Sequence, residues 1–595
     1  MADDHVYTRF APLLLLLAGG LVYANSLNGD FIYDDVHSIV QNPDIRSLWP
    51  PQWLQPTDAV HEAVNSRPMA SFTLVVNYAF GGLEMPGYRL FNIAVHLLCG
   101  LALYGVVRRT AASTALAFAC ALLWLVHPLQ SQCINYIIQR RESLASLFYL
   151  LALYSAIRGF DANGRGWYAA SILSCILGVA SKEIAATAPF AIALYDRVYR
   201  SGSWAEVWRR RRFYIGFAAP LALLIFLIWG DPHGDSVGFE RVGVWTYLLN
   251  QCVAIIHYLR LIVWPHPLLL DYGPPRALLL VDVTPQALLL SGLLALCSWG
   301  LLRHPRLAYP GLWFFILLAP SSSVTPIAEE WAAERRVYLA LAGPLALVCV
   351  VVHGAARRVL AARALYAGLG LALCAALALG VTTRQRNGAY RSGVAIWQSD
   401  LARWPDNPRA LRGLAFGYQS AGDLDAAIGH YRQALQIEPD DPGVYFNLGL
   451  IYERRGDTDA AIQHYARAVA LVPNMAKGHN NLGAALKAMG RFQQALTHYR
   501  RAVEIDSGYV LAHKNLALLL VDLGDPVAAV DHLVAIARLR PDDRQAQYAA
   551  GKALQAIERW EAAVASYRRA LAIDPNFAAA RQSLAGVLQQ KDAQF

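Results

Sequence analysis

One stretch decides the fold of the C-terminal part of the chain: PDDPGVYFNLGLIYERRGDTDAAIQHYARAVALVP, from Pro439 to Pro473. Prolines recur around it at a spacing of 34 residues, and Ser507 stands at the one grid point without proline: Pro405, Pro439, Pro473, Pro541 and Pro575. Small residues and tyrosines recur in the same register: Gly422, Gly456, Gly490 and Gly524; Ala427, Ala461, Ala495, Ala529 and Ala563; Tyr431, Tyr465, Tyr499 and Tyr567. Proline ends a helix and small residues let two helices approach, so the pattern predicts stacked helix pairs.

A period of 34 residues is the length of the tetratricopeptide repeat. We expect five units and a capping helix over residues 408–595, preceded by a linker or degenerate half-repeat over 391–407. Each unit cannot bury its apolar face alone, so neighbouring units stack into an α-solenoid with a concave face. Such a face usually binds a peptide or protein segment, and we predict a protein or peptide partner there.

Residues 1–390 have a different character, which the composition of the whole chain reflects: 56% of its residues are hydrophobic and only 16% are charged. A membrane-spanning helix needs roughly 20 apolar residues. Eleven candidate spans separated by short polar links are Phe10–Leu27, Phe91–Val107, Ala111–Val126, Leu144–Ile157, Trp167–Ala180, Ile184–Tyr195, Phe213–Trp229, Ala287–Leu302, Leu307–Pro320, Val337–Val352 and Leu365–Val381. The predicted fold class is therefore all-α, a polytopic membrane domain followed by a repeat solenoid.

A twelfth apolar segment, Val242–Val263, contains Gln251, His257 and Arg260. With eleven spans the arginine-rich loops fall on one side of the membrane, which the positive-inside rule assigns to the cytoplasm. If the twelfth segment also crossed, the later arginine clusters would change sides. We therefore expect it to lie on or partly in the outer face, and the repeats to lie outside as well.

The predicted outer loop, residues 28–88, carries an acidic pair in the motif Phe31-Ile-Tyr-Asp-Asp35, followed by Asn42-Pro43. An acidic pair in a loop is most often solvated surface. Here it stands beside an apolar bilayer rim, where the pKa of a carboxylate rises and the group becomes a competent base. We predict Asp34 and Asp35 as catalytic residues and leave open which of them is the base.

Lys182 is the only lysine before Lys477 in a chain rich in arginine. A lone ammonium group at a predicted outer helix end can bind a phosphate as a point charge, and the carboxylate of the adjoining Glu183 can orient it. Two more charged clusters stand at predicted outer helix ends, where arginine runs against the usual bias: Arg140-Arg141-Glu142, after His127, and Glu334-Arg335-Arg336, before Tyr338. Together with Arg67 these groups predict a site that binds phosphate and deprotonates a hydroxyl.

The sequence does not predict a nucleic-acid interface, a disulfide framework or a cysteine metal site. The net charge of +9 belongs almost entirely to the membrane half, so a nucleic-acid interface is not predicted. The eight cysteines show neither metal-site nor disulfide spacing. No metal is predicted with confidence, and Asp34 and Asp35 are its only candidate ligands. The acidic n-region at Asp3-Asp4 favours an uncleaved N-terminal anchor over a signal peptide.

These motifs resemble those of the transmembrane and tetratricopeptide-repeat O-mannosyltransferases, which are glycosyltransferases of the GT-C superfamily. The resemblance spans nearly the whole chain and rests on Phe31-Ile-Tyr-Asp-Asp35, Ser66-Arg67-Pro68, His127-Pro128, Arg140-Arg-Glu-Ser-Leu-Ala145, Lys182-Glu183, Leu270-Asp-Tyr-Gly-Pro274, Glu334-Arg-Arg-Val-Tyr338 and the repeats. Two departures stand out. Glu142 replaces the family's usual aspartate, and Ala340 stands where proline is common.

The resemblance implies transfer of mannose or another hexose from a polyprenyl-phosphate carrier to an acceptor hydroxyl, with inversion, on the outer membrane face. Asp34 or Asp35 would be the base. Lys182 with Arg335 or Arg336, and Arg140 with them, would hold the carrier phosphate. Glu142, Glu183, Arg67, His127 and Tyr338 complete the predicted binding set. The implied co-substrate is the lipid-linked sugar, and a divalent metal stays possible.

Two other functions compete with this one. A transporter or flippase of lipid-linked sugars would place ionisable groups near the bilayer midplane and often shows repeats within its membrane half, neither of which is evident here. A membrane-tethered scaffold would need a single span. The lysine-poor, arginine-rich composition favours a bacterial inner membrane with the repeats in the periplasm, or the ER membrane and lumen in a eukaryote.

Overall fold

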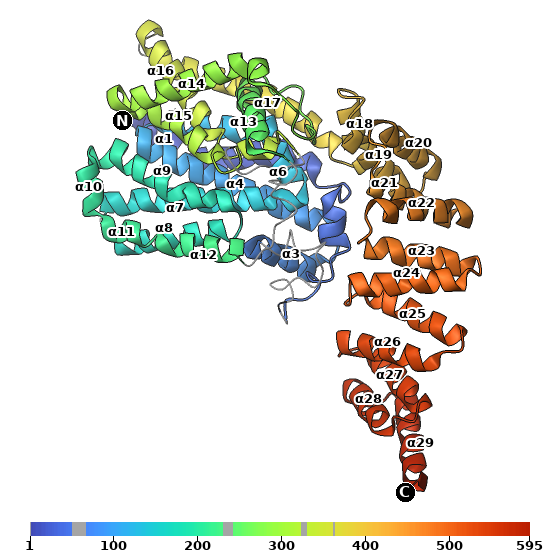
Figure 1. Ribbon diagram of the computed structural model, residues 1–595. Helices are drawn as coiled ribbons and strands as arrows, with labels where there is room; N and C mark the ends of the chain where they lie inside the picture. The colour runs from blue at the N-terminus through green and yellow to red at the C-terminus, as the bar shows by residue number, and fades with distance from the viewer. Residues whose placement is uncertain are drawn as a thin grey trace. The chain divides into compact units, whose positions relative to one another are not determined.

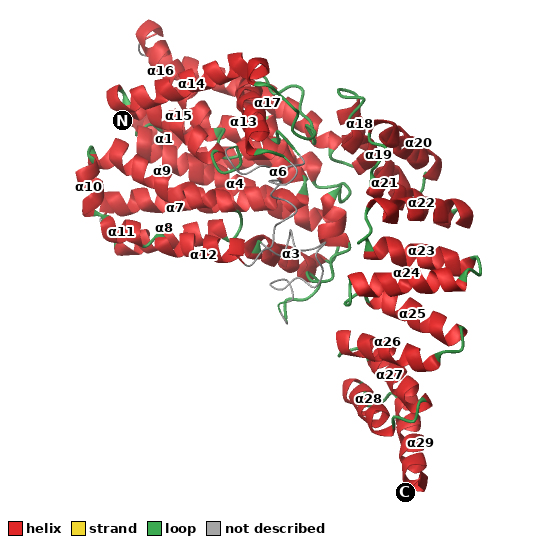
Figure 2. Cartoon of the chain, in the orientation of Figure 1, coloured by secondary structure: helices red, strands yellow, loops and turns green. Residues whose placement is uncertain are grey.

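The computed structural model describes residues 2–49, 51, 67–162, 164–229, 242–322, 330–360 and 363–594. Within these ranges every regular element is a helix (Figure 2), as the composition predicts. The chain forms two compact units, Met1–Gly413 and Leu414–Phe595. The boundaries proposed above at residues 390 and 408 stay predictions.

Unit 1 is a helical bundle whose elements follow one another through short links. Its α-helices are α1 (Ala2–Tyr23), α3 (Pro68–Gly81), α4 (Met85–Ala111), α5 (Thr114–Leu125), α6 (Ser131–Asn135), α7 (Arg140–Ala162), α8 (Arg165–Val179), α9 (Ala188–Tyr195), α10 (Trp204–Arg209), α11 (Arg211–Ile215), α12 (Ala218–Trp229), α13 (Val244–Val263), α14 (Leu280–Arg303), α15 (Pro305–Leu318), α16 (Ala342–Leu360), α17 (Ala364–Ala389) and α18 (Gly393–Leu401). Short 3₁₀ turns include η6 (Ile137–Gln139), η7 (Glu183–Thr187) and η9 (Glu334–Val337).

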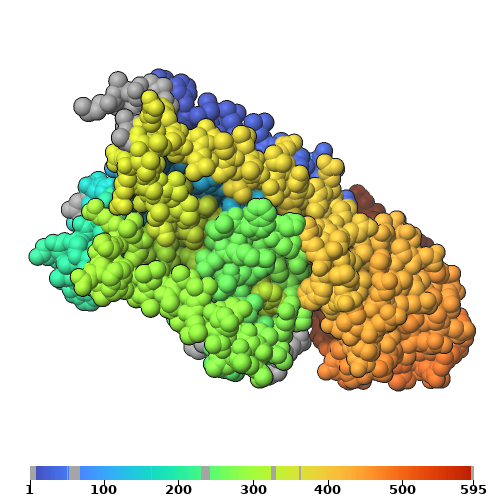
Figure 3. Space-filling view, turned by 90° about the horizontal axis from the view of Figure 1, so that it is seen from above, coloured from blue at the N-terminus to red at the C-terminus, as the bar shows by residue number. Residues whose placement is uncertain are grey.

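The helix α7 lies at the centre of the bundle and packs against α4 and α8 (Figure 1). In its most apolar part 72% of the residues are buried, against 6% in α14 and 17% in α17. Leucine, valine and tryptophan side chains cover the outer helices, and the green and yellow residues of α13 to α17 form one broad face in Figure 3. Exposed apolar helices of this kind suit a lipid environment, since every backbone group is bonded within its own helix.

The number of spans differs from the expected eleven. Eight described helices are long and apolar enough to cross a membrane, or nine if α5 and the short helices after it form one bent span. All eleven predicted segments are helical, but α8, α9 and α15 have only 15, 8 and 14 residues. At about 1.5 Å per residue such helices are shorter than the hydrocarbon core. The chain is a multi-pass membrane protein by this measure.

The segment predicted to lie on the outer face forms α13, which is long and apolar enough to be a span. Its contacts reach the link before α16 and other parts of the bundle, among them α14. Gln251 donates to the carbonyl of Trp331 (3.0 Å), and the Tyr258 hydroxyl accepts from the backbone N–H of Ala333 (2.8 Å). In Figure 1, α13 also runs at a steep angle to α7 and α8. The surface position of this segment stays a prediction, since the length and apolar composition of α13 also allow it to span a membrane.

Unit 2 contains the repeat helices. The helix α19 (Pro408–Ala421) runs into this unit, and it is followed by α20 (Leu424–Ile437), α21 (Pro442–Arg454), α22 (Thr458–Leu471), α23 (Ala476–Ala488), α24 (Phe492–Ile505), α25 (Val510–Asp522), α26 (Pro526–Leu539), α27 (Arg544–Ala556), α28 (Trp560–Ile573) and α29 (Ala578–Gln594). From α21 onward each helix packs on the next, as a solenoid requires. A Cβ at Gly449 would lie 2.5 Å from the Tyr465 ring, which explains the small residue there.

The turns between paired helices need a left-handed residue. Gly422, Gly456, Gly490 and Gly524 supply it with φ between 74° and 89°. At the fifth grid point Glu558 takes the same conformation, with φ of 59°. A side chain in this region is strained, so the fifth turn is less stable than the others.

Candidate functional site

The two carboxylates of the predicted catalytic pair have different surroundings. Asp35 is fully buried and accepts hydrogen bonds from the backbone N–H groups of Ile138 (2.8 Å), Ile137 (3.3 Å) and Ile32 (3.4 Å). Ile32 belongs to the same loop as Asp35, and Ile137 and Ile138 belong to η6, directly before α7. Asp35 therefore anchors the loop to the N-terminal end of α7. Burial raises the pKa of Asp35 to about 7 against the effect of these hydrogen bonds.

Asp34 is exposed, and the three backbone N–H groups donate to Asp35 and not to Asp34. Its backbone N–H donates to the Tyr136 hydroxyl (3.3 Å), and its carboxylate lies within electrostatic reach of Arg141, Arg335 and Arg409. Loss of hydration on the sides that face the protein raises the pKa of Asp34, although the Tyr136 hydroxyl and the three cations act to lower it. Asp34 is thus an exposed carboxylate within electrostatic reach of three cations.

The residue before the acidic pair has an unusual backbone conformation. Tyr33 has a left-handed backbone with φ of 48°, and its ring packs edge-on against Trp397 with centroids 5.4 Å apart. A non-glycine residue adopts this conformation only where the surroundings hold it, and such strain gathers at functional sites.

The first residues of α7 also point in different directions. Arg140 is buried among α3 and α4, where it donates to Asn77 Oδ1 (2.6 Å) and to the carbonyl of Tyr88 (3.3 Å) and stacks over the Phe91 ring at 4.7 Å. Arg141 is half-buried, and the charges nearest to it are Arg335, Arg67, Glu142 and Glu183. Its Nε makes no hydrogen bond among the described residues.

Two ion pairs join α7, the residues after α8 and the start of α3. Lys182 donates to Glu142 in a short contact, and Arg67 Nη2 lies 2.8 Å from Glu183 Oε2. Lys182 and Arg67 keep 16% and 18% of their side-chain surface exposed, so both remain accessible to a ligand. Burial would raise the pKa of Glu183, but Arg67 and Lys182 hold it at about 2. Glu183 is therefore ionised at neutral pH.

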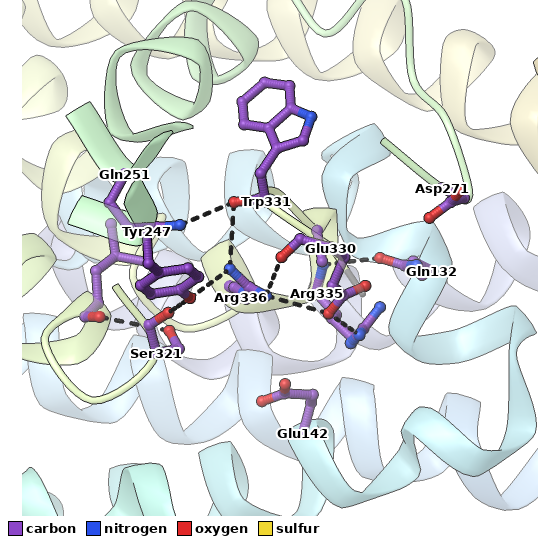
Figure 4. A network of polar contacts seen from close by, with 12 residues as sticks. Gln132, Glu142, Tyr247, Gln251, Asp271, Ser321, Glu330, Trp331, Arg335 and Arg336 are labelled. Carbon is purple, nitrogen blue, oxygen red and sulfur yellow. Dashed lines mark hydrogen bonds and ion pairs between the residues drawn. The ribbon is translucent and has the colours of Figure 1, made fainter. Parts of the chain in front are cut away.

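The link before α16 supplies the remaining cations (Figure 4). Glu330 pairs with Arg335 in a short contact and with Arg336 Nη2 at 3.2 Å, while the backbone N–H of Arg335 donates to Gln132 Oε1 (2.8 Å). Arg336 is only 3% exposed and donates from Nη1 to the Tyr247 hydroxyl (3.4 Å), whereas Arg335 keeps 15% of its side chain exposed. Burial opposes the charge of Glu330, but the two arginines hold its pKa at about 2.

The structure thus gathers most of the predicted site residues into one connected cluster. Its members are Asp34, Arg67, Glu142, Lys182, Glu183 and Arg335. Other predicted residues make structural contacts instead. His127 bonds to the carbonyl of Ile262 (3.1 Å) at the end of α13, and the Tyr338 hydroxyl bonds to His96 (2.8 Å) in the bundle core. Ser66, part of a quoted motif, lies outside the described residues.

Two residues near the cluster were missed by the sequence interpretation, Tyr136 and Arg409, and Arg141 was named only as a member of its charged cluster. The helical period of 100° per residue separates Arg140 from Arg141, but it does not tell which of them faces the cluster. Tyr136 stands in a polar link without a motif signal. Arg409 is distant in sequence, and nothing local indicates its place.

No group of three or more histidine, cysteine, aspartate or glutamate side chains gathers as a metal site in the part of the chain that the structure describes. Both carboxylate oxygens of Asp35 accept hydrogen bonds from backbone N–H groups, so Asp34 and Asp35 do not form a pair of ligands for one metal ion.

Comparison with protein families finds matches in both units. A family described as dolichyl-phosphate-mannose-protein mannosyltransferase matches residues 65–229, which include Arg67, Arg141, Glu142, Lys182 and Glu183. Tetratricopeptide-repeat families match residues 417–456, 451–490, 476–509 and 514–578. The predicted resemblance and the predicted repeat fold are therefore confirmed.

Among similar proteins is the protein O-mannosyl-transferase Tmtc2 of Drosophila melanogaster, 26% identical over 309 residues that cover 48% of this chain and 33% of that one. The protein O-mannosyl-transferase TMTC4 of Mus musculus is 25% identical over 506 residues, covering 72% of this chain and 67% of that one. The chain thus spans about a third of the length of the fly protein. A solved tetratricopeptide-repeat protein, YrrB, matches 31% of this chain and 96% of its own at 20% identity, with a TM-score of 0.27.

Proposed function

We propose that this protein is a membrane glycosyltransferase. It moves mannose or another hexose from a polyprenyl-phosphate donor to a hydroxyl group of a protein or peptide acceptor, with inversion at the anomeric carbon. The observation that carries the proposal is the exposed Asp34 carboxylate within electrostatic reach of Arg141 and Arg335. A base beside accessible cations is what transfer from a phosphate leaving group to a hydroxyl requires.

The cations form the phosphate site. Arg335 and Lys182 already have carboxylate partners in Glu330 and Glu142, which hold the two side chains in place. Arg141 adds a half-buried guanidinium whose Nε has no partner among the described residues. Guanidinium groups bind phosphate oxygens in pairs, and each charge-assisted contact is about twice as strong as a neutral one.

In the proposed reaction Asp34 accepts the proton of the acceptor hydroxyl as its oxygen attacks the anomeric carbon. The bond between that carbon and the phosphate oxygen breaks, and the electron pair leaves with the polyprenyl phosphate. Arg141, Arg335 and Lys182 stabilise the charge that develops on this leaving group. Attack on the face opposite to the phosphate inverts the configuration.

The proposed compartment is the outer face of the membrane, which is the periplasm in a bacterium. The arginine-rich links at Arg109, Arg158, Arg200 and Arg306 support this orientation through the positive-inside rule. The proposed acceptor surface is the concave side of the repeats. Labelling of single cysteines in intact cells should reach position 49, which carries the exposed Trp49, and should not reach position 208.

The decisive experiment uses the full-length protein in detergent or nanodiscs with radiolabelled polyprenyl-phosphate mannose and polyprenyl-phosphate glucose. Transfer to an acceptor peptide, or slow hydrolysis of the donor, supports the proposal, and NMR of the product gives its anomeric configuration. Movement of intact donor across vesicles without consumption identifies a flippase and refutes the enzyme. Binding of acceptor peptides without transfer or hydrolysis of the donor supports a membrane-tethered scaffold and refutes the enzyme.

A further inference from the structure

A short segment between α13 and α14, residues 268–272, is clamped by two buried acids. Glu334 Oε1 accepts from the backbone N–H of Leu269 (2.7 Å) and from the Tyr272 hydroxyl (3.1 Å). Asp400 Oδ2 accepts from the backbone N–H groups of Leu270 (2.8 Å) and Asp271 (3.1 Å). Glu334 belongs to the same link as Arg335, and Asp400 belongs to α18. Residues 268–272 therefore connect the link before α16, which carries Arg335 and Arg336, to α18 near the C-terminal end of unit 1.

Asp271, within this segment, is 3% exposed, and its partners come from the start of α19. Arg409 Nη1 lies 3.3 Å from Asp271 Oδ1, and Asn407 Nδ2 lies 3.3 Å from Asp271 Oδ2. A buried carboxylate without compensation is strongly destabilising, so Arg409 is needed where it stands.

The charge of Arg409 also reaches the candidate site. It acts on Glu330, the partner of Arg335, and on Asp34. Asp271 and Glu330 in turn act on each other as like charges. Arg409 therefore lies among three acids, Asp34, Asp271 and Glu330, two of which belong to the proposed machinery.

We infer that Arg409 is a positioning residue of the proposed transferase site: through its ion pair with Asp271 it holds segment 268–272 beside the link that carries Glu334 and Arg335. This inference rests on the proposed function. It gives the first turn of α19 a role in catalysis in addition to packing, so the site depends on residues that follow the membrane bundle in the chain.

The role has a consequence for the pH dependence of the reaction. The groups that face Asp34 are the Tyr136 hydroxyl, Arg141, Arg335 and Arg409, and each of them lowers the pKa of Asp34. Removing one of the three cations raises that pKa. Because the base must be ionised, the acid limb of kcat/KM against pH then moves to higher pH.

The test uses full-length Arg409→Gln with Arg409→Lys, which keeps the charge, and the double variant Arg409→Gln with Asp271→Asn. The matched control is Arg467→Gln, because Arg467 makes an exposed ion pair with Asp440 (2.8 Å) within the repeats. The measurements are kcat/KM for sugar transfer over pH 5 to 9 and the melting temperature of each protein.

We expect Arg409→Gln to move the acid limb to higher pH and Arg409→Lys and Arg467→Gln to leave it in place. The double variant should recover the melting temperature, since no unpaired buried carboxylate remains, but it should keep the shifted limb. The inference is overturned if the acid limb of kcat/KM in Arg409→Gln lies at the same pH as in wild type. It is also overturned if the acid limb of the double variant returns to the wild-type pH. An inactive wild type overturns the proposed function and the inference with it.

Discussion

The acidic pair offers the sharpest test, because its two members are predicted to fail in different ways. Asp34→Asn keeps the size of the side chain and removes its ability to accept a proton. Asp34 is exposed and holds none of the backbone donors that Asp35 holds, so the fold should be unaffected. We expect kcat to fall by about 10² to 10⁴ with an unchanged melting temperature and unchanged donor binding.

Asp35→Asn should give the opposite result. Asp35 accepts from three backbone N–H groups, and an asparagine oxygen replaces its best contact, to Ile138, while the amide NH₂ faces the donors of Ile32 and Ile137. A buried donor left without an acceptor costs about 1–3 kcal/mol. We expect a loss of stability of roughly that size, with turnover reduced much less than in Asp34→Asn.

The assay combines single-turnover transfer of a labelled sugar with thermal unfolding in the same detergent. Donor affinity, measured in the absence of acceptor, serves as the control for an intact phosphate site. An Asp34→Asn protein that transfers sugar at the wild-type rate refutes the assignment of the base. A folded Asp35→Asn protein that binds donor but shows the larger loss of turnover reverses the two roles.

Three further predictions concern other parts of the chain. Lys182→Met should weaken donor binding about 10- to 150-fold, because a charge-assisted contact worth about 1.5 to 3 kcal/mol is lost. Lys487→Met, which breaks an ion pair in the repeats, should leave donor binding unchanged. Calorimetric titration with the donor measures both, and equal affinities would reduce Lys182 to a structural residue. Glu558→Gly should stabilise unit 2 by about 1 kcal/mol, because glycine adopts the left-handed turn without strain; a lower unfolding midpoint in urea would contradict this. The contribution of Asp35 to the free energy of unfolding should fall as pH rises from about 4 to about 7, because the folded state binds the proton of Asp35 more tightly than the unfolded chain does. Asp35→Asn lacks this contribution. The difference in melting temperature between wild type and Asp35→Asn should therefore become smaller over this range.

Much of the architecture follows from the sequence. The 34-residue grid of proline, glycine and tyrosine predicts the repeats, because each position answers a local need such as a helix end, a left-handed turn or a close approach of two helices. Apolar runs predict helices in the membrane half for an equally local reason, since a backbone in lipid must satisfy its own hydrogen bonds. The number of spans does not follow from the apolar runs alone, because helices such as α9 are shorter than the hydrocarbon core.

The candidate site could be predicted only in part. The sequence singled out Lys182, because it is alone among arginines, and the acidic pair, because two carboxylates at a membrane surface are unusual. It did not separate Asp34 from Asp35. That difference comes from the backbone N–H groups of Ile137 and Ile138, about a hundred residues away, which occupy one carboxylate and leave the other open.

The same holds for the cations. Arg140 and Arg141 are neighbours of identical chemistry, and the packing of α7 against α3 and α4 decides that the first is structural and the second faces the site. Arg409 joins the cluster only because residues 268–272 meet the start of α19. The sequence by itself determined the helices, the repeats and the kinds of group available for chemistry. The tertiary structure decided which of those groups are free to act, because burial and hydrogen bonding depend on residues that are distant in the chain.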